Sequence, residues 1–131
     1  MINNVIKSNK KLLAFEDAPV WKDSLDFAVK VYTITKQFPK DEFYGITNQL
    51  RRASSSISAN LAEGFGRNGQ KEKLQFYSIA YGSLLESKSF IYLSIKLGYI
   101  EKDSQLILQV ESLQKQINAI KNSIRKAKEW Y

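Results

Sequence analysis

Residues 61–70 read L-A-E-G-F-G-R-N-G-Q, and how this stretch folds decides the fold class of the whole chain. The letters G-F-G-R-N-G satisfy the G-x-G-x-x-G pattern of dinucleotide-binding loops, in which a strand precedes the glycines and a helix follows them. The residues before Gly64, A-S-S-S-I-S-A-N-L-A-E, continue a helical apolar spacing instead, and no βαβ unit surrounds them. The stretch therefore predicts a helix–helix connection, in which Gly64 and Gly66 supply left-handed or closely packed positions.

Outward from this connection, apolar residues recur at spacings of three and four in both directions. Four helices are expected, at about residues 20–37, 41–63, 70–97 and 102–128. Pro39 separates the first two because it steers Phe38 out of the helical region, and Gly98 suits the left-handed end of the third. The sequence predicts an all-α, antiparallel up-and-down four-helix bundle over residues 19–131, after a flexible or loosely docked segment of residues 1–18.

The composition excludes several classes of site. The 131 residues include no cysteine and no histidine, so disulfides, thiolate zinc sites, imidazole ligands and Ser-His-Asp or Cys-His catalysis are ruled out. We expect no metal and no cofactor. No apolar run suits a signal peptide or a membrane span, so we expect a cytoplasmic protein without a membrane partner. The charge of +7 favours nucleic acid, anionic lipid or an acidic protein as partner, although a lysine-rich soluble surface explains it equally well.

The helix expected at residues 41–63 has an unusual free face. Polar residues form one stripe along it, at spacings of three and four: Gln49, Arg52, Ser56, Asn60 and Glu63. Small residues form a second stripe beside it: Ser55, Ala59 and Ala62. An ordinary surface helix would carry lysine and glutamate there. Small residues let neighbouring backbones approach, so this helix is expected to be surrounded, either inside the bundle or at a subunit contact.

The helix expected at residues 70–97 has its apolar spacing along one stripe: Phe76, Ile79, Ser83, Glu86, Phe90, Leu93 and Leu97. Glu86 therefore lies at a core-type position of this helix, between Ser83 and Phe90. A carboxylate there is costly unless it is paired, and Arg51 and Arg52 are the available cations. We favour a structural ion pair over a catalytic acid with a raised pKa, because nothing nearby supplies a nucleophile or a metal partner. The expected polar network consists of Gln49, Arg51, Arg52, Asn60, Glu63 and Glu86, and no catalytic residue is assigned.

Basic residues gather toward the end of the last helix, where residues 112–128 contain no acid. Part of this signal is structural, because cations near a helix C-terminus complement its dipole. Arg67 lies in a connection beside the exposed amides of a new helix, an arrangement that favours anions. The candidate nucleic-acid contacts are Arg67, Lys115, Lys121, Arg125, Lys126 and Lys128.

Residues 49–67, Q-L-R-R-A-S-S-S-I-S-A-N-L-A-E-G-F-G-R, resemble the signature of the intervening-sequence four-helix-bundle proteins, which are encoded within bacterial large-subunit ribosomal RNA genes and also stand alone. The flanking stretches V-Y-T-I-T-K-Q-F-P-K-D-E-F-Y-G-I, F-Y-S-I-A-Y-G-S-L-L-E and L-G-Y-I fit as well, so the resemblance covers about residues 21–128. The signature residues that match are Gln49, Arg51, Arg52, Asn60, Glu63, Gly64, Gly66, Arg67 and Glu86. Ser54 and Ser55 stand where alanine and valine are commoner in that signature.

The resemblance implies a bundle that assembles as a ring-like homopentamer, with no enzymatic activity. The family is also similar to the accessory protein of diversity-generating retroelements, a basic pentamer that binds nucleic acid and its reverse transcriptase. The first hypothesis is therefore a non-enzymatic oligomer that binds RNA, DNA or a nucleic-acid-handling protein, such as a reverse transcriptase or a ribosome-associated partner. The second is a structural or adaptor oligomer with a protein partner and no nucleic-acid binding. An enzyme that uses Glu63 or Glu86 ranks below both.

Overall fold

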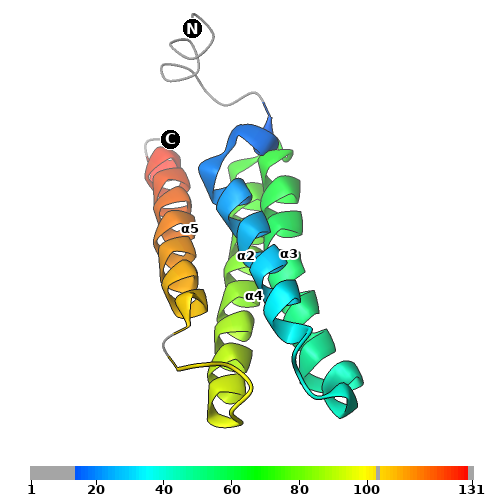
Figure 1. The fold of residues 1–131 in the computed structure, drawn as a ribbon. Helices are drawn as coiled ribbons and strands as arrows, with labels where there is room; N and C mark the ends of the chain where they lie inside the picture. The colour runs from blue at the N-terminus through cyan, green and yellow to red at the C-terminus, as the bar shows by residue number, and fades with distance from the viewer. Residues whose placement is uncertain (1–13, 103, 130–131) are drawn as a thin grey trace, which may run out of the picture.

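The computed structural model of the chain describes residues 14–102 and 104–129, and every regular element in these ranges is a helix. Four long helices run alternately up and down the molecule, so that the described chain begins and ends at the same end of the bundle (Figure 1). They are α2 (Pro19–Thr35), α3 (Asn48–Phe65), α4 (Gln70–Lys96) and α5 (Gln105–Glu129). The prediction of an all-α fold with four helices is confirmed.

Each helix packs chiefly against two of the others. α3 contacts α2 and α4, and α5 contacts the same two helices from the other side. α3 and α5 therefore occupy diagonal corners of the bundle. Their outer faces point in opposite directions, so a surface built on α3 is separate from one built on α5.

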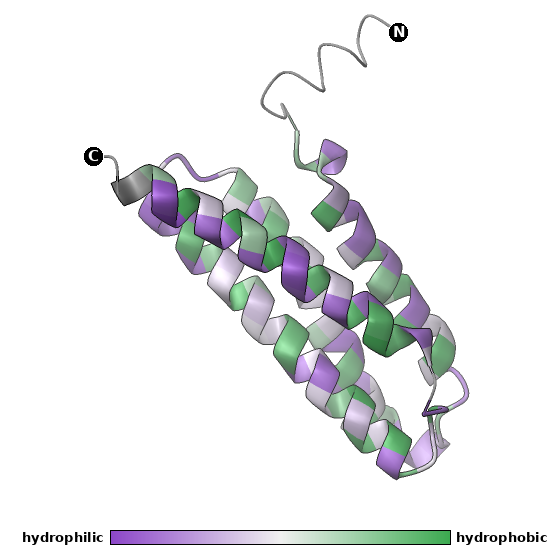
Figure 2. Cartoon of the chain, turned by 90° about the vertical axis from the view of Figure 1, so that its left-hand side faces the viewer, coloured by the Kyte–Doolittle hydropathy of each residue, from purple (hydrophilic) through white to green (hydrophobic). Residues whose placement is uncertain are grey.

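The core consists of one layer of apolar side chains from all four helices. Its largest fully buried members are Phe27, Val31, Leu50, Ile57, Leu84, Ile91, Leu106, Val110, Leu113 and Ile117. The last four form the stripe that the sequence predicts for α5, and Figure 2 shows apolar and polar residues alternating along this helix in the foreground. Burying a side chain of this size stabilises the fold by about 1.5–3 kcal/mol before entropy is counted.

The polar residues of the core are small hydroxyls, and all of them except Thr47 bond to their own helices. Ser24 Oγ donates to the carbonyl oxygen of Trp21 at 2.7 Å, and Ser94 Oγ donates to that of Phe90 at 2.7 Å. Because these hydroxyls are satisfied locally, they add no cost of an unpaired buried group. They keep neighbouring helices close together.

α4 turns a different face to the core than the one expected. Its buried positions are Tyr77, Ala80, Leu84, Ser87, Ile91 and Ser94. The spacing pattern had pointed to the neighbouring stripe, which includes Ile79, Glu86 and Leu93, and all three of these are exposed. Apolar residues lie on both stripes, so periodicity alone does not tell which one faces the chain's own core.

The connection between α2 and α3 contains more structure than expected. A 3₁₀ turn, η2 (Lys40–Glu42), is followed by a single π turn, η3 (Phe43–Thr47), before α3 begins at Asn48. The helix predicted from residue 41 therefore starts seven residues later. Within η3, Gly45 has a non-helical backbone with φ −106° and ψ −118°. A Cβ there would lie 2.8 Å from Glu42 Oε1, so an added side chain would displace that carboxylate.

The connection between α4 and α5 follows the prediction. Gly98 has φ +81°, the left-handed conformation that favours glycine. The Tyr99 N–H donates to the carbonyl oxygen of Ser94 at 2.8 Å, and the Gly98 N–H donates to that of Ile95 at 3.0 Å. This pair of bonds is the Schellman motif, which satisfies the last carbonyls of the helix.

The N-terminal part of the described chain is docked on the bundle. The short 3₁₀ turn η1 (Phe15–Asp17) contacts α2 and α3, and the Phe15 ring meets Trp21 edge-on at 5.1 Å between centroids. Residues 14–18 therefore belong to the packed domain. The rest of the segment expected to be flexible or loosely docked, residues 1–13, lies outside the described residues.

Candidate nucleic-acid interface and polar helix face

The glycines of the stretch 61–70 form a helix connection, and only one of them is closely packed. Gly64 is buried in the last turns of α3, where an added Cβ would lie 2.7 Å from Tyr77 Cε1. Gly66 caps α3 with a right-handed backbone, so neither glycine is left-handed. Lys73 Nζ donates to the carbonyl oxygens of Gly64 and Phe65, at 3.2 and 2.8 Å, and so covers the end of α3.

Arg51 points away from the expected polar network and joins α3 to α2. Its Nε donates to Thr35 Oγ1 at 2.8 Å, and its Nη2 donates to the carbonyl oxygen of Tyr32 at 3.4 Å. The guanidinium carbon lies 4.8 Å from the centre of the Tyr32 ring. Arg51 therefore stabilises the packing of two helices.

Glu86 is exposed in the bundle, so the expectation that it lies in the core of the chain is wrong. It lines a hollow of about 420 Å³ between α3 and α4, together with Gln49, Arg52 and Ser56. Within residues 14–102 and 104–129, Glu86 makes no ion pair with Arg51 or Arg52. Its coupling to Arg52 stays a prediction, which requires a second surface to close the hollow.

The remaining polar residues of α3 bond locally. Asn60 Nδ2 donates to the carbonyl oxygen of Ser56 at 2.8 Å. Glu63 forms an ion pair with Arg67 at 2.8 Å, and the Arg67 guanidinium stacks 4.7 Å from the centre of the Phe76 ring. Arg67, a candidate phosphate contact, is thus already engaged within the chain. The expected network is not one cluster but three separate local contacts and one open hollow.

Three of the basic residues proposed as nucleic-acid contacts are exposed on α5. Lys115, Arg125 and Lys126 are exposed, whereas Lys121 is half-buried with its Nζ 5.0 Å from the centre of the Tyr81 ring. Lys128 lies in the last turns of α5, and its side chain is outside the described part. These residues lie on the diagonal corner opposite α3.

Tyr81 joins α4 to α5 beside these cations, and sequence reasoning missed it. Its hydroxyl oxygen accepts from Gln114 Nε2 at 3.2 Å and from Asn118 Nδ2 at 3.3 Å. Gln114 Oε1 accepts in turn from Lys88 Nζ at 3.0 Å. The two amide hydrogen bonds, Gln114 first, and the nearby lysines hold the pKa of Tyr81 below its usual value. The spacing of Gln114 and Asn118, one helical turn apart, places both amides on one face of the last helix, but it does not pair them with Tyr81.

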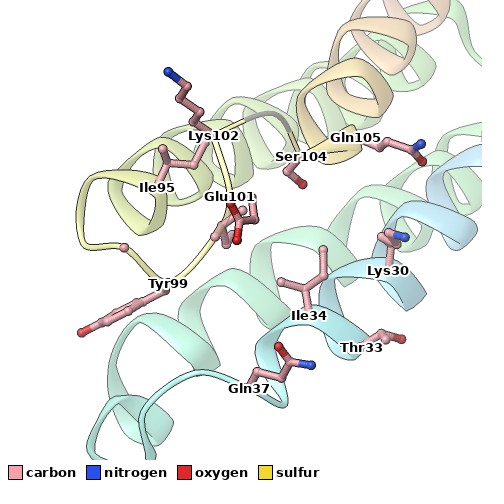
Figure 3. Close-up of a pocket in the computed structure, with 12 residues that line it drawn as sticks. Lys30, Thr33, Ile34, Gln37, Ile95, Tyr99, Glu101, Lys102, Ser104 and Gln105 are labelled. Carbon is pink, nitrogen blue, oxygen red and sulfur yellow. The ribbon is translucent and has the colours of Figure 1, made fainter.

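A separate hollow of about 600 Å³ lies between α2 and the connection that leads into α5 (Figure 3). Lys30, Thr33, Ile34 and Gln37 line its α2 side, and Glu101 faces them from the connection. Among the described residues, the lining combines one carboxylate with lysines and amides. Residue 103, which adjoins this lining, is outside the described ranges.

The model of one protein family, described as the 23S rRNA-intervening sequence protein, matches residues 16–124 of the chain. The chain belongs to this family. The resemblance inferred from residues 49–67 is thereby confirmed. None of the curated proteins matches the chain.

A crystal structure related to this family member shows the same fold. It is that of a protein of unknown function from the S23 ribosomal protein family of Bacteroides thetaiotaomicron VPI-5482, with 22% sequence identity and a TM-score of 0.59. The match covers 82% of this chain and 96% of the other. None of the helices in the described part of this family member is long and apolar enough to cross a membrane.

Proposed function

We propose that this member of the family is a non-enzymatic, self-associating bundle that binds nucleic acid, or a protein that handles nucleic acid, through the basic outer face of α5. One observation carries the proposal: the cations of α5 lie on the corner of the bundle diagonal to α3. A face for assembly and a face for binding are therefore separate on one small domain.

The assembly face is proposed on α3 and its two flanks. On α2, Leu25, Val29 and Tyr32 are exposed on one side, and the contact of Arg51 with Tyr32 places that side next to α3. On α4, Ile79, Leu93 and Leu97 share the stripe of Glu86, which faces α3 from the other side. The small residues of α3 lie between these apolar flanks. A patch of this kind is typical of a protein–protein contact.

A contact between two different flanks can close into a ring, because it is heterologous and repeats around an axis. Five subunits are proposed on the family resemblance. In such a ring the basic face of α5 would be repeated once per subunit, and its charge would add along one bound strand.

Binding through α5 would be electrostatic. Lysines and arginines that displace counterions from phosphates give affinity with little dependence on base sequence. The logarithm of affinity for single strands should fall against the logarithm of salt concentration, with a slope of roughly −0.7 per phosphate neutralised.

The test compares single-stranded RNA with duplex DNA by fluorescence anisotropy at several salt concentrations. Changing Lys115, Arg125 and Lys126 together to glutamine should flatten the slope and leave melting unchanged. A matched control changes three exposed lysines elsewhere, Lys22, Lys71 and Lys96. Equal effects of the two triple variants would contradict a specific basic face. No binding by the parent at physiological salt would favour the protein adaptor instead.

A further inference from the structure

A third hollow, of about 500 Å³, lies at the end of the bundle where α2 leads into α3. Residues of α2, of the connection and of α3 line it. The residues that matter chemically are Lys36, Lys40, Phe43, Tyr44, Thr47 and Arg51. Its volume falls in the range of small-ligand sites. The basic face of α5 does not account for it, and Tyr44 is the one lining residue that it shares with the hollow beside Glu86.

Two aromatic rings stand exposed at the mouth of this hollow. Phe43 is 52% exposed and Tyr44 is 88% exposed, and their rings meet edge-on at 4.9 Å between centroids. Both belong to the single π turn η3, an irregularity that is often found at functional sites. Bases of single-stranded nucleic acid stack on exposed aromatic side chains, because every base has a flat π face.

A buried hydroxyl without a partner lies in the same lining. Thr47 is only 3% exposed, and its Oγ1 has no hydrogen-bond partner among the residues that the structure describes. Buried polar atoms are nearly always paired in native proteins. The atom itself is covered, so a ligand with donors and acceptors on its edge, as a nucleobase has, would supply the missing partner only after the Thr47 side chain rotates toward the hollow.

The charge of the lining suits a phosphate. Lys36 and Lys40 are exposed on its rim, and Arg51 is held in place on the wall by Thr35 and the Tyr32 ring. No carboxylate is among the lining residues. The two acids in the neighbouring turn are Asp41, which is exposed, and Glu42, whose carboxylate is turned away.

Hydrogen bonds of Glu42, on the side away from the hollow, hold the π turn η3 in place. Glu42 Oε2 accepts a hydrogen bond from the Tyr99 hydroxyl at 2.9 Å, and Glu42 Oε1 accepts a long one from the Ile46 N–H at 3.5 Å. The Phe38 ring packs on Tyr99 at 5.3 Å between centroids. A stacking platform that is fixed before binding loses less entropy when the ligand arrives.

We propose that this hollow accepts one base of a single-stranded nucleic acid, stacked on Phe43 and Tyr44, with the adjoining phosphate beside Lys36 and Lys40. Thr47 Oγ1, which is covered in the structure, bonds to the edge of that base once its side chain rotates toward the hollow. The inference rests on the proposed binding of nucleic acid and adds a contact to the base itself. The hollow and the last turns of α5 lie at opposite ends of the bundle, so the two contacts can be removed separately (Figure 1).

The decisive experiment compares a labelled single strand with an abasic strand of the same length, using fluorescence anisotropy on the full chain. Both strands carry the same phosphates, so contacts to phosphate alone bind them equally. Loss of stacking should weaken the abasic strand by roughly five- to 150-fold for each base bound. Equal affinities with a clear salt dependence would overturn the base site and leave the electrostatic proposal intact.

Variants of the lining residues test whether the difference in affinity between the two strands arises in this hollow. Phe43→Ala and Tyr44→Ala should each shrink the difference between the two strands, and Tyr92→Ala serves as the matched control, since it removes a half-exposed ring of α4 outside this lining. Light scattering reports the assembly of each variant. If Phe43→Ala disperses the assembly and leaves the strand difference unchanged, the hollow belongs to a subunit contact and the proposal is wrong.

Thr47→Val gives an independent readout, because it removes the hydroxyl and keeps the shape. With no partner to lose, the free protein should melt at the parent temperature or above it, while the preference for the base-containing strand falls. A lower melting temperature with an unchanged preference would show that the hydroxyl serves the fold alone.

Competition by a nucleoside monophosphate against the bound strand shows whether the natural ligand of the hollow is a base within a strand or a free nucleotide. Competition only at concentrations far above that of the strand assigns the hollow to the strand, and competition at comparable concentrations assigns it to a free nucleotide. If neither the strands nor the monophosphate bind, the base site is overturned together with the proposed function.

Discussion

At residue scale, Gly64 shows how one missing side chain fixes the packing of two helices. A Cβ at this position would lie 2.7 Å from Tyr77 Cε1 and 3.1 Å from Phe76 Cβ. The Tyr77 ring is itself buried and has little room to move. The close approach of α3 and α4 at this point therefore requires glycine, although its backbone is helical.

Gly64→Ala should consequently lower the free energy of unfolding by about 1–3 kcal/mol, the usual cost of overpacking. Gly66→Ala is the matched control, because its nearest neighbour would be 3.7 Å away and its backbone is right-handed. That variant should gain about 0.4–1 kcal/mol from reduced freedom of the unfolded chain. Chemical denaturation of both variants checks the difference, and a Gly64→Ala protein as stable as the parent would contradict the packing argument.

At the scale of helices and connections, Tyr81 and Tyr99 each join two neighbouring segments, and their surroundings shift the pKa values of the two hydroxyls in opposite directions. Two amide donors and two lysines lower the pKa of Tyr81 between α4 and α5. The hydrogen bond to the Glu42 carboxylate, followed by burial and by negative charge from Glu42 and Asp41, raises the pKa of Tyr99. The two groups therefore favour opposite charge states in the folded protein.

Ultraviolet titration of Tyr81→Phe and Tyr99→Phe against the parent should show Tyr81 ionising below pH 10 and Tyr99 above it. The stabilisation linked to Tyr81 is present above pH 10, the unfolded value, and is lost as the pH falls through its lowered pKa. That linked to Tyr99 is present below pH 10 and is lost as the pH rises through its raised pKa. The reverse order of ionisation would refute the assigned hydrogen bonds.

Sequence periodicity predicted the helices well and their inner faces less well. The bounds of α2, α4 and α5 are within three residues of those expected, because their apolar stripes are long. α3 begins later than expected because the backbone at Gly45 is non-helical, which the spacing of apolar residues does not reveal. The sequence could not show that Tyr81, Gln114 and Asn118 meet, because residues far apart along the chain converge only in the packed bundle.

At the scale of the whole molecule, the misplaced stripe of α4 is informative. Ile79, Glu86 and Leu93 follow a core-like spacing, yet the chain's own core lies on the neighbouring stripe. A second apolar stripe with a carboxylate in its middle is expected where another subunit covers the helix. If a second subunit covers this stripe, its side chains form part of a core between the two subunits.

Glu86 and Arg52 provide the test, because both line the open hollow between α3 and α4. If a second subunit closes this hollow, each residue becomes a buried charge that needs the other, and losing one partner costs about 3–5 kcal/mol. Glu86→Ala and Arg52→Ala should each disperse the assembly toward the 15.1 kDa chain, while the isolated bundle keeps its helical content. The double variant should be little worse than either single one, since the interaction is lost only once.

Light scattering coupled to size-exclusion chromatography measures the mass, and circular dichroism measures the helix. Glu111→Ala is the control, because it removes an exposed carboxylate from α5 on the opposite corner and should leave the mass unchanged. A parent protein that elutes as a monomer at micromolar concentration would rule out assembly. Replacing the exposed Glu86 would then change the free energy of unfolding by no more than about 0.5 kcal/mol, as for an ordinary surface residue. A monomer would count against the adaptor hypothesis as well, since both hypotheses assume an oligomer.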